Sequence, residues 1–270
     1  MSTHRDHAIV LKLSGEALSG AGRALEPLAF ESSAQQILTL VRAGRRVGVV
    51  VGGGNLHRGS EPWGSYGLSR SASDELGMHS TALNAIALFH QLQHLDDELR
   101  VDVVAKRGPV RPMFSPWRRG LRGQGQSDVV IVAGGTGVGG VSTDVAAPML
   151  AEDLGSTRIV MSKFGVDGIY SRDPRVFPEQ ARHLPVVTVG EALRRDLRFM
   201  DREAMSLCRP LQITVHVVPA ADPDAITDLV LHGADIGSTM IPGSADDIAD
   251  DTYPEHKVIR HGLPGARLVP

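Results

Sequence analysis

Short aliphatic runs of strand length recur along the chain, and they constrain its fold more than any other feature. Runs of this kind, rich in β-branched residues and bounded by Gly, Pro or charged residues, are typical of strands buried in a parallel sheet. Only 4% of the residues are aromatic, so aliphatic side chains must fill most of the core. The runs lie at 8–13, 46–51, 101–105, 128–133, 158–161 and 213–218.

Stretches with helical periodicity alternate with these runs. The longest places apolar residues on a stripe that we expect to be buried. Strand–helix alternation predicts an α/β fold, a three-layer sandwich in which helices cover both faces of a mostly parallel central sheet. The helical stretches are 28–43, 73–94, 143–154, 189–197, 201–208 and 222–231, and the predicted buried stripe in the second is Leu76, Leu83, Ile86, Ala87 and Leu92.

The chain is long enough for one large domain. Its hydrophobic content of 42% supports a sizeable core, and we expect the domain to cover residues 1–242. Residues 243–270 combine acidic residues and prolines with little periodicity, which predicts a poorly ordered C-terminal tail. The segment 107–126 is rich in Arg, Gly and Pro and is expected to be a loop.

Charge and cysteine content narrow the range of partners and compartments. The net charge of −3 gives no reason to expect a nucleic-acid or anionic-membrane partner. Cys208 is the only cysteine, so it cannot form an internal disulfide, and a reducing cytoplasm is the expected compartment. No apolar run approaches the ~20 residues of a membrane span. The sequence therefore predicts a soluble, cytoplasmic protein.

Glycine-rich segments follow three of the predicted strands, at the carboxyl ends where ligands bind in open α/β sheets. In the first, Lys12 precedes Ser14 and Gly15; glycine lets the backbone approach a phosphate, and lysine adds a mobile positive charge. In the second, the glycines at 52–54 can form a nest of backbone amides for an anion, and Arg58 can clamp a phosphate with two hydrogen bonds. Both segments predict phosphate binding.

The third segment, 133–144, formally matches the dinucleotide fingerprint at 135–140. That fingerprint expects an acidic residue after the next strand, where it holds a ribose hydroxyl. Here the next strand leads into Ser162 and Lys163, which suit a phosphate better; a nicotinamide-dependent dehydrogenase is the corresponding alternative. The chain contains no G-x-x-x-x-G-K-[ST] motif, no protein-kinase signature and no metal-ligand spacing among its histidines.

In their order and spacing, these segments resemble those of the bacterial UMP kinases, a group within the amino-acid-kinase family. The likeness runs from about residue 8 to residue 241. It implies the amino-acid-kinase fold and an enzyme that moves the γ-phosphoryl group of ATP to UMP, with Mg2+ carried by ATP, no phosphoenzyme, and a homo-oligomer that is a hexamer by resemblance. The residues that carry the likeness are 11–18, 48–59, Asp74 with 77–78, 135–137 with 142–144, 165–170 with 173–174, Leu197 with 200–201, and 236–241.

The resemblance also implies roles for individual residues. The implied catalytic residues, which neutralise charge and organise the magnesium carried by ATP, are Lys12, Arg58, Asp144, Lys163 and Asp201. The implied ATP-binding residues are Lys12, Leu13, Ser14, Gly15, Gly54, Arg58, Phe164, Tyr170 and Asp173. The implied acceptor-binding residues are Gly53, Asp74, Thr136, Gly137, Val138, Gly139, Gly140, Val141, Ser142 and Thr143.

The acceptor half departs from the family pattern. UMP kinases usually carry Asn-Pro or Met-Pro followed by aromatic residues where this chain has 138–141, and Gly140 in place of an aromatic residue removes a stacking face and widens the pocket. Phe164 likewise replaces a polar residue near the adenosine. Two alternatives stay open: a paralogous kinase for another anionic acceptor, such as a modified nucleotide or a phosphonate, and a non-enzymatic oxyanion-binding or storage protein, which would need neither Lys12 nor Asp201.

Overall fold

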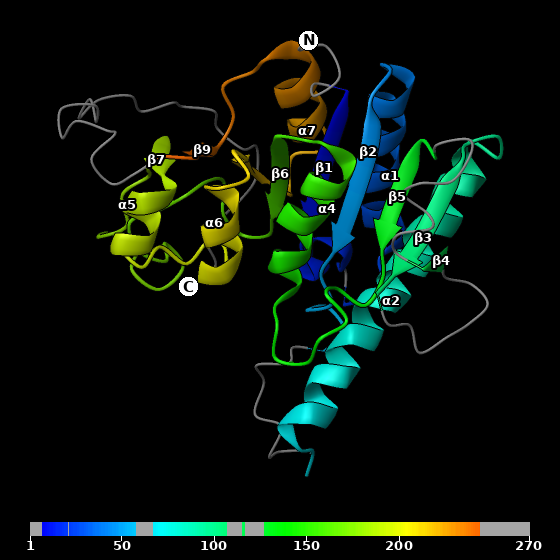
Figure 1. Ribbon diagram of the computed structural model, residues 1–270, viewed down its shortest axis with the longest axis horizontal. Coiled ribbons are helices and arrows are strands. Elements are labelled where there is room, and N and C mark those ends of the chain that lie inside the picture. Colours follow the sequence, from blue (N-terminus) through cyan, green and yellow to red (C-terminus); the bar gives the residue numbers. More distant parts are fainter. Residues whose placement is uncertain (1–6, 21, 58–66, 107–114, 117–126, 244–270) are drawn as a thin grey trace.

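The computed structural model describes residues 7–20, 22–57, 67–106, 115–116 and 127–243. Its strands are β1 (Ala8–Leu13), β2 (Arg46–Val51), β3 (Val101–Ala105), β4 (Ser115–Pro116), β5 (Val129–Val132), β6 (Arg158–Lys163), β7 (Val186–Thr188), β8 (Thr214–Pro219) and β9 (Ser238–Ile241). Within these described ranges they form one nine-stranded sheet in the order β4-β3-β5-β2-β1-β6-β8-β9-β7 (Figure 1).

The sheet is mostly parallel, as predicted. Among the described strands, every pairing is parallel except that of β8 with β9. The central strand β1 lies between β2 and β6, with Leu13 opposite Val51 on one side and Ser162 on the other. The glycine-rich segments therefore leave the sheet side by side at its carboxyl edge.

Helices cover both faces of the sheet. The longer ones are α1 (Pro27–Arg42), α2 (Arg70–Leu95) and α4 (Ala146–Leu154), and in Figure 1 α4 lies in front of the sheet and α1 behind it. The shorter ones are the 3-10 helices η1 (Gly15–Leu18) and η3 (Thr143–Val145), the α-helices α5 (Val189–Arg194), α6 (Arg202–Cys208) and α7 (Ala225–Thr227), and the π-helix η4 (Asp228–His232).

Two apolar clusters fill the space between the layers. Because successive strand residues point to opposite faces, Val49 and Val51 pack with α1, α2 and α7, whereas Val50 packs with α4, α5 and α6. The side chains at these contacts are almost all Val, Leu, Ile, Ala and Met. The three-layer prediction is confirmed, and so is the prediction of an aliphatic core.

The predicted stripe on α2 is partly wrong. Leu76 and Leu83 are 44% and 52% exposed, whereas Leu92 is buried as predicted. The buried face of α2 instead includes Thr81 and Leu88, and Leu83 points away from it because residues two apart in a helix do not share a face. Leu76 lies near the N-terminal end of α2, which projects past the carboxyl ends of the strands, beyond the layer that could cover it (Figure 1).

Other differences concern short elements. The strands β7 and β9 were not predicted, because three or four residues are too few to show a period. The predicted helix at 222–231 is instead the short α7 followed by η4. Of the predicted loop at 107–126, the structure describes only residues 115–116, which form the strand β4. Of the predicted tail it describes only Gly243. No helix in the described ranges is long and apolar enough to cross a membrane.

Candidate active site

The first two glycine-rich segments pack against each other, backbone to backbone. The Gly52 N–H donates to the Leu13 carbonyl at 2.8 Å. A Cβ placed on Gly15 would lie 2.5 Å from the Gly54 nitrogen, and one on Gly52 would lie 2.8 Å from the Gly15 nitrogen. At Gly15 and Gly52 there is therefore no room for a side chain, because the two backbones lie in direct contact.

Polar groups on α2 fix these segments in place. The fully buried Asn84 donates through Nδ2 to the Gly52 carbonyl at 2.7 Å and to Asn55 Oδ1 at 2.8 Å. One turn earlier, Thr81 Oγ1 accepts from the Gly134 N–H at 2.9 Å, which ties the third glycine-rich segment to the same helix. The sequence analysis missed both residues, although polar side chains three apart on the buried face of a helix were a usable signal.

A buried ion pair lies under the three segments. Lys12, on β1, places Nζ 2.7 Å from Oδ1 of Asp144, which belongs to η3, and both side chains are about nine-tenths buried. Asp144 Oδ2 also accepts from the backbone N–H of Asp201 at 3.2 Å. Burial alone would raise the pKa of Asp144, but the charges of Lys12 and Lys163 outweigh it and hold that pKa below the ordinary value.

Lys163 ends β6, the neighbour of β1, and its ammonium belongs to the same group of charges. Burial lowers the pKa of Lys163, and the positive charge of Lys12 lowers it further, while Asp144 and Glu16 oppose that shift. Arg175 adds a further positive charge that also lowers the pKa of Lys163. The sequence analysis identified the two lysines but missed Arg175.

The buried hydroxyl of Ser14 belongs to the first glycine-rich segment, two residues after Lys12. Its Oγ makes no hydrogen bond to any other described residue, and the side chain is 7% exposed. A buried polar atom without a partner is costly unless a ligand or water satisfies it. The cations, the backbone amides and this hydroxyl together form a site suited to an anion.

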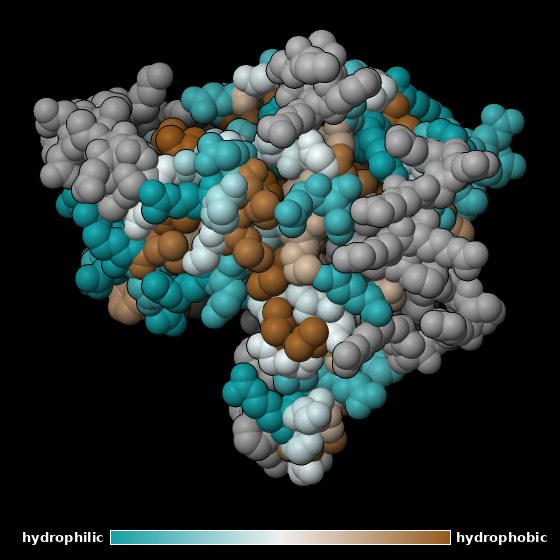
Figure 2. All heavy atoms as spheres, viewed as in Figure 1, coloured by the Kyte–Doolittle hydropathy of each residue, from teal (hydrophilic) through white to brown (hydrophobic). Residues whose placement is uncertain are grey.

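The third segment forms a loop beside the N-terminal half of α2. A Cβ on Gly139 would lie 3.5 Å from Oδ2 of Asp74, and one on Gly140 would lie 3.8 Å from the same atom. At the base of the loop, Thr136 is buried. Val138 and Val141 are 51% and 41% exposed, and Figure 2 shows hydrophobic surface where Figure 1 draws this loop. The predicted acceptor residues thus converge, but those at 138–141 face solvent.

The remaining acceptor candidates are constrained by close packing, by one capping hydrogen bond and by backbone conformation. A Cβ placed on Gly53 would lie 2.8 Å from Ser80 Cβ, so Gly53 packs directly on α2. Ser142 caps η3 by accepting from the Asp144 N–H at 3.1 Å, and a Cβ on Gly135 would lie 3.5 Å from Thr143 Oγ1. Gly137 has a φ of 71°, which other residues rarely adopt.

The predicted adenosine residues all follow β6. Phe164 is 54% exposed, and Tyr170 donates through its hydroxyl to Asp167 Oδ1 at 2.7 Å. Burial and the bond to Asp167 raise the pKa of Tyr170 above its ordinary value. Asp173 forms an ion pair with Arg175 at 2.8 Å, which lowers the pKa of Asp173. These side chains share one segment, which follows β6.

Other predicted residues are only partly placed at the site. Asp201 contributes its backbone N–H to Asp144, but its side chain is exposed and makes no capping bond to α6. Leu13 is buried in the core and contributes its backbone. Arg58 lies outside the described residues. Within the described ranges, no group of three or more His, Cys, Asp or Glu side chains is placed to hold a metal ion.

Comparisons with known proteins agree with this fold. The sequence model of the amino acid kinase family matches residues 7–219. The uridylate kinase of Thermotoga petrophila is 34% identical over 237 residues, a match that covers 87% of this chain and 99% of that protein. The uridylate kinase of Arthrobacter sp. is 36% identical over 234 residues, which is 87% of this chain and 94% of that protein.

Solved structures show the same architecture. The crystal structure of UMP kinase from Bacillus anthracis superposes with a TM-score of 0.79 at 26% identity, covering 88% of this chain and 97% of the other. The crystal structure of UMP kinase from Ureaplasma parvum superposes with a TM-score of 0.77 at 27% identity, covering 87% of this chain and 98% of the other.

Proposed function

The chain belongs to the amino acid kinase family, and from that premise we propose that it transfers the γ-phosphoryl group of ATP to UMP, forming ADP and UDP. It is an enzyme of the nucleoside monophosphate kinase type. The observation that carries the proposal is the Lys12–Asp144 pair, buried beneath two interlocked glycine-rich segments. A dehydrogenase or a storage protein would have no use for a lysine fixed in this way.

The chemistry needs no general base. The attacking phosphate oxygen of a nucleoside monophosphate is already anionic, so catalysis consists of in-line positioning and neutralisation of charge. Lys12 is held by Asp144 and Lys163 lies beside it, so both can stabilise charge on the transferring group. Arg58 is proposed to add a third cation, and the backbone amides around Gly15 and Gly54 are proposed to contact the phosphates of ATP. We therefore propose direct transfer without a phosphoenzyme.

Magnesium is proposed to enter the site on the phosphates of ATP. The donor set fits this route: Asp144 is committed to Lys12 and to a backbone N–H, while the Asp201 carboxylate lies at the start of α6 without a capping bond. We propose that the Asp201 carboxylate and the Ser14 hydroxyl, which makes no hydrogen bond to a described residue, contact an ion carried in this way. The ion would supply further neutralisation of phosphate charge.

Donor and acceptor are proposed to occupy opposite sides of the lysines. Phe164, Tyr170 and Asp173 would hold the adenosine of ATP after β6. On the other side, Asp74 would hold the acceptor ribose. The loop after β5 would enclose the acceptor base and phosphate through Thr136, Gly137, Val138, Gly139, Gly140, Val141, Ser142 and Thr143, with Gly53 contacting the nucleotide.

A second acceptor class is the main alternative, and one observation favours it. Val138 and Val141 are exposed, and the glycines between them leave the space next to Asp74 open. An open wall of this kind accommodates a substituted base or another anionic acceptor more readily than a closed one would. Specificity therefore depends on this loop, whereas the donor side stays the same for either acceptor.

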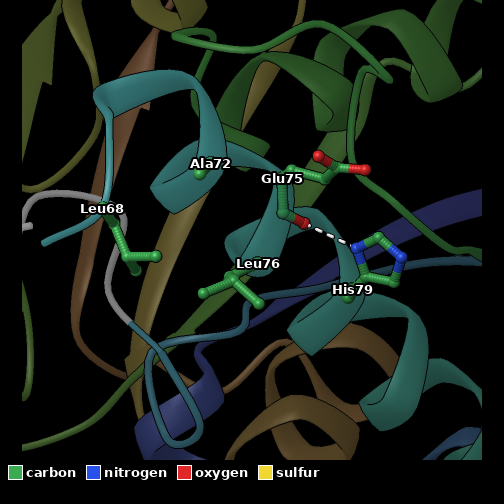
Figure 3. Close-up of a pocket in the computed structure, with 5 residues that line it drawn as sticks. All are labelled: Leu68, Ala72, Glu75, Leu76 and His79. Carbon is green, nitrogen blue, oxygen red and sulfur yellow. Dashed lines mark hydrogen bonds between the residues drawn. The ribbon is translucent and has the colours of Figure 1, made fainter. Parts of the chain in front are cut away.

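We also propose that copies of the chain assemble in the cytoplasm, a hexamer being the expectation from the resemblance. The projecting end of α2 carries a groove lined by Leu68, Ala72, Glu75, Leu76 and His79, as Figure 3 shows. Asp74, which is proposed to hold the acceptor ribose, lies two residues from both Ala72 and Leu76. The groove and the acceptor site are therefore on different sides of α2. Sedimentation of Leu76→Glu beside the unaltered protein tests this surface, with a smaller assembly expected for the variant.

An acceptor panel tests the proposed activity. ADP release is followed with ATP and magnesium against UMP, CMP, dUMP and phosphonates, and the product is identified by mass. Turnover with UMP that far exceeds turnover with the others supports the proposal. Tight ATP binding without UMP turnover would contradict it and would favour the alternative acceptor class.

Lys12→Met tests the assigned catalytic role. Removal of one preorganised cation is expected to lower kcat by about a hundredfold or more. Because the single change leaves Asp144 buried without its partner, the double variant Lys12→Met/Asp144→Asn is compared for stability. Arg42→Met removes an exposed cation on α1 and serves as the matched control, with kcat unchanged.

A further inference from the structure

The segment that follows β6 is fastened to β9 by a pair of polar side chains. Ser238, on β9, is 2% exposed, and its Oγ accepts from the Ile169 N–H at 2.8 Å. The same oxygen lies 3.0 Å from Nε2 of His183. Ile169 directly precedes Tyr170, one of the residues proposed to hold adenosine, so this pair acts on the donor side of the site.

The Ser238 hydroxyl accepts from the Ile169 N–H and has one proton of its own to donate, so a neutral His183 ring can accept that proton at Nε2 with its own proton on Nδ1. Gly168 packs so tightly against both side chains that a Cβ there would collide with His183 Nε2 and with Ser238 Oγ. A larger residue at position 168 would therefore have no room beside this pair.

His183 also contacts Tyr170 directly. The two residues form an isolated antiparallel bridge, and their rings meet edge to face with centroids 5.2 Å apart. The adjacent Leu184 N–H donates to the Ile169 carbonyl at 2.8 Å. One histidine thus holds both the backbone and the ring of the donor segment.

We infer that His183 is a positioning residue for the donor nucleotide, which acts with Ser238 to hold Ile169 and Tyr170 in the arrangement that binds adenosine. The inference rests on the proposed function for the identity of that nucleotide. It does not depend on which acceptor the enzyme uses, because the contacts lie on the donor side.

Protonation of His183 removes the acceptor nitrogen of its ring and leaves two N–H donors. The charged groups that face the ring are Asp167, on the donor segment, and Asp235, which precedes β9. Burial lowers the pKa of His183 below its ordinary value, against the opposing effect of these two carboxylates. The neutral form is therefore the bound form, and its contribution is complete above about pH 6.5 and is lost as the pH falls through the lowered pKa.

Two variants of His183 separate hydrogen bonding from packing. His183→Phe keeps a ring against Tyr170 but leaves the Ser238 hydroxyl without its hydrogen-bond partner on that ring. His183→Gln offers an amide oxygen at a similar reach and does not titrate. His216→Gln is the matched control, because His216 on β8 bonds to the hydroxyl of Thr239, and Thr239 points to the opposite face of β9 from Ser238.

The test measures the Kd of ATP without acceptor, and hydrogen exchange at the Ile169 amide. For His183→Phe we expect faster exchange and a Kd about fivefold to tenfold higher, the size of one lost buried hydrogen bond. His183→Gln is expected to restore both at pH 7, and to abolish the weakening of ATP binding in the unaltered protein below about pH 6.5. The control is expected to match the unaltered protein.

Faster exchange in His183→Phe with an unchanged ATP Kd would overturn the inference, since the pair would then serve folding alone. An equal effect in His216→Gln would also overturn it. Failure of the unaltered protein to phosphorylate UMP would contradict the proposed acceptor only, because the ATP Kd comparison needs no acceptor.

Discussion

The glycines after β1 and β2 differ from those after β5 in what surrounds them. Added Cβ atoms at Gly15 and Gly52 would lie 2.5 and 2.8 Å from a backbone nitrogen of the facing segment. Added Cβ atoms at Gly139 and Gly140 would meet only the Asp74 side chain, at 3.5 and 3.8 Å. Close packing requires glycine after β1 and β2, whereas the glycines after β5 leave open space beside the proposed acceptor site.

This difference separates the constant part of the site from the variable part. The packed segments hold a buried ion pair whose geometry any phosphoryl transfer from ATP could use. The open loop, 134–143, contains no ionisable residue and can change without disturbing those charges. We expect substitutions in the packed segments to alter stability and kcat together, and substitutions at loop positions without positive φ, such as Gly139, to alter acceptor binding alone.

The largest effect is expected for Gly15→Ala. The added methyl group would collide with the Gly54 backbone nitrogen and with Asn55 Oδ1, which is held by its hydrogen bond from Asn84. Overpacking against fixed backbone is expected to lower the unfolding free energy by about 3 kcal/mol, and activity should fall with it. Urea unfolding and kcat measure the two effects.

Gly20→Ala is the matched control for this change. An added Cβ there would meet only the flexible side chain of Glu26, at 3.4 Å, so a change below about 0.5 kcal/mol is expected. Equal losses in the two variants would remove the distinction between packed and open glycines.

Asn84→Ala tests the polar support of the packed segments. The change leaves the buried Gly52 carbonyl without its donor and also removes the bond to Asn55. We expect the unfolding free energy to fall by about 2 kcal/mol and the KM for ATP to rise. Gln93→Ala removes a comparable amide bond from the far end of α2, to the Leu99 carbonyl, and should leave that KM unchanged.

How far the sequence predicts this site depends on whether the signal is local. Lys12 and the glycines after β1 and β2 were predicted because each lies at the end of an aliphatic run or directly after it, and the run fixes its place at the sheet edge. Asn84 and Arg175 were missed because their importance depends on partners far along the chain or in space, which periodicity does not record. The role of Asp144 came from family resemblance, and its pairing with Lys12 required the fold.

The fold was predictable to the same extent and for the same reason. Long aliphatic runs become central strands, since burial on both faces leaves little choice of residue. The last two strands in the sheet order, β9 and β7, are too short for a period. The exposed Leu76 and Leu83 were assigned to a core that other residues of α2 occupy. Where the end of α2 projects beyond the sheet, tertiary context decides burial rather than the helical pattern.

The pH dependence of turnover is expected to come from the packed region. Burial and Lys12 lower the pKa of Lys163, so its positive charge is lost at a lower pH than that of an exposed lysine. As the pH rises through this lowered pKa, kcat/KM for ATP should fall by up to about tenfold per pH unit. Lys163→Arg keeps the charge and should remove this alkaline limb. If the limb persisted in that variant, another group would be responsible.

The smallest effect on stability is expected for Gly139→Ala, in the open loop. Its φ is not in the left-handed region, and the added methyl group would lie at ordinary contact distance from Asp74. The unfolding free energy should change by less than about 0.5 kcal/mol. Because the methyl group occupies the space next to Asp74, the KM for UMP should rise a few-fold while the KM for ATP and kcat stay constant, the pattern of a purely ground-state binding change.

Gly140→Ala separates the effect of filling the space next to Asp74 from the effect of backbone strain. Its φ of 76° disfavours any side chain, so this variant is expected to lose about 1 kcal/mol of stability that Gly139→Ala retains. Together the two variants test the proposed division of the site. If Gly139→Ala raised the KM for ATP as much as the KM for UMP, the loop after β5 would belong to both substrates, and the acceptor could not vary independently of the donor.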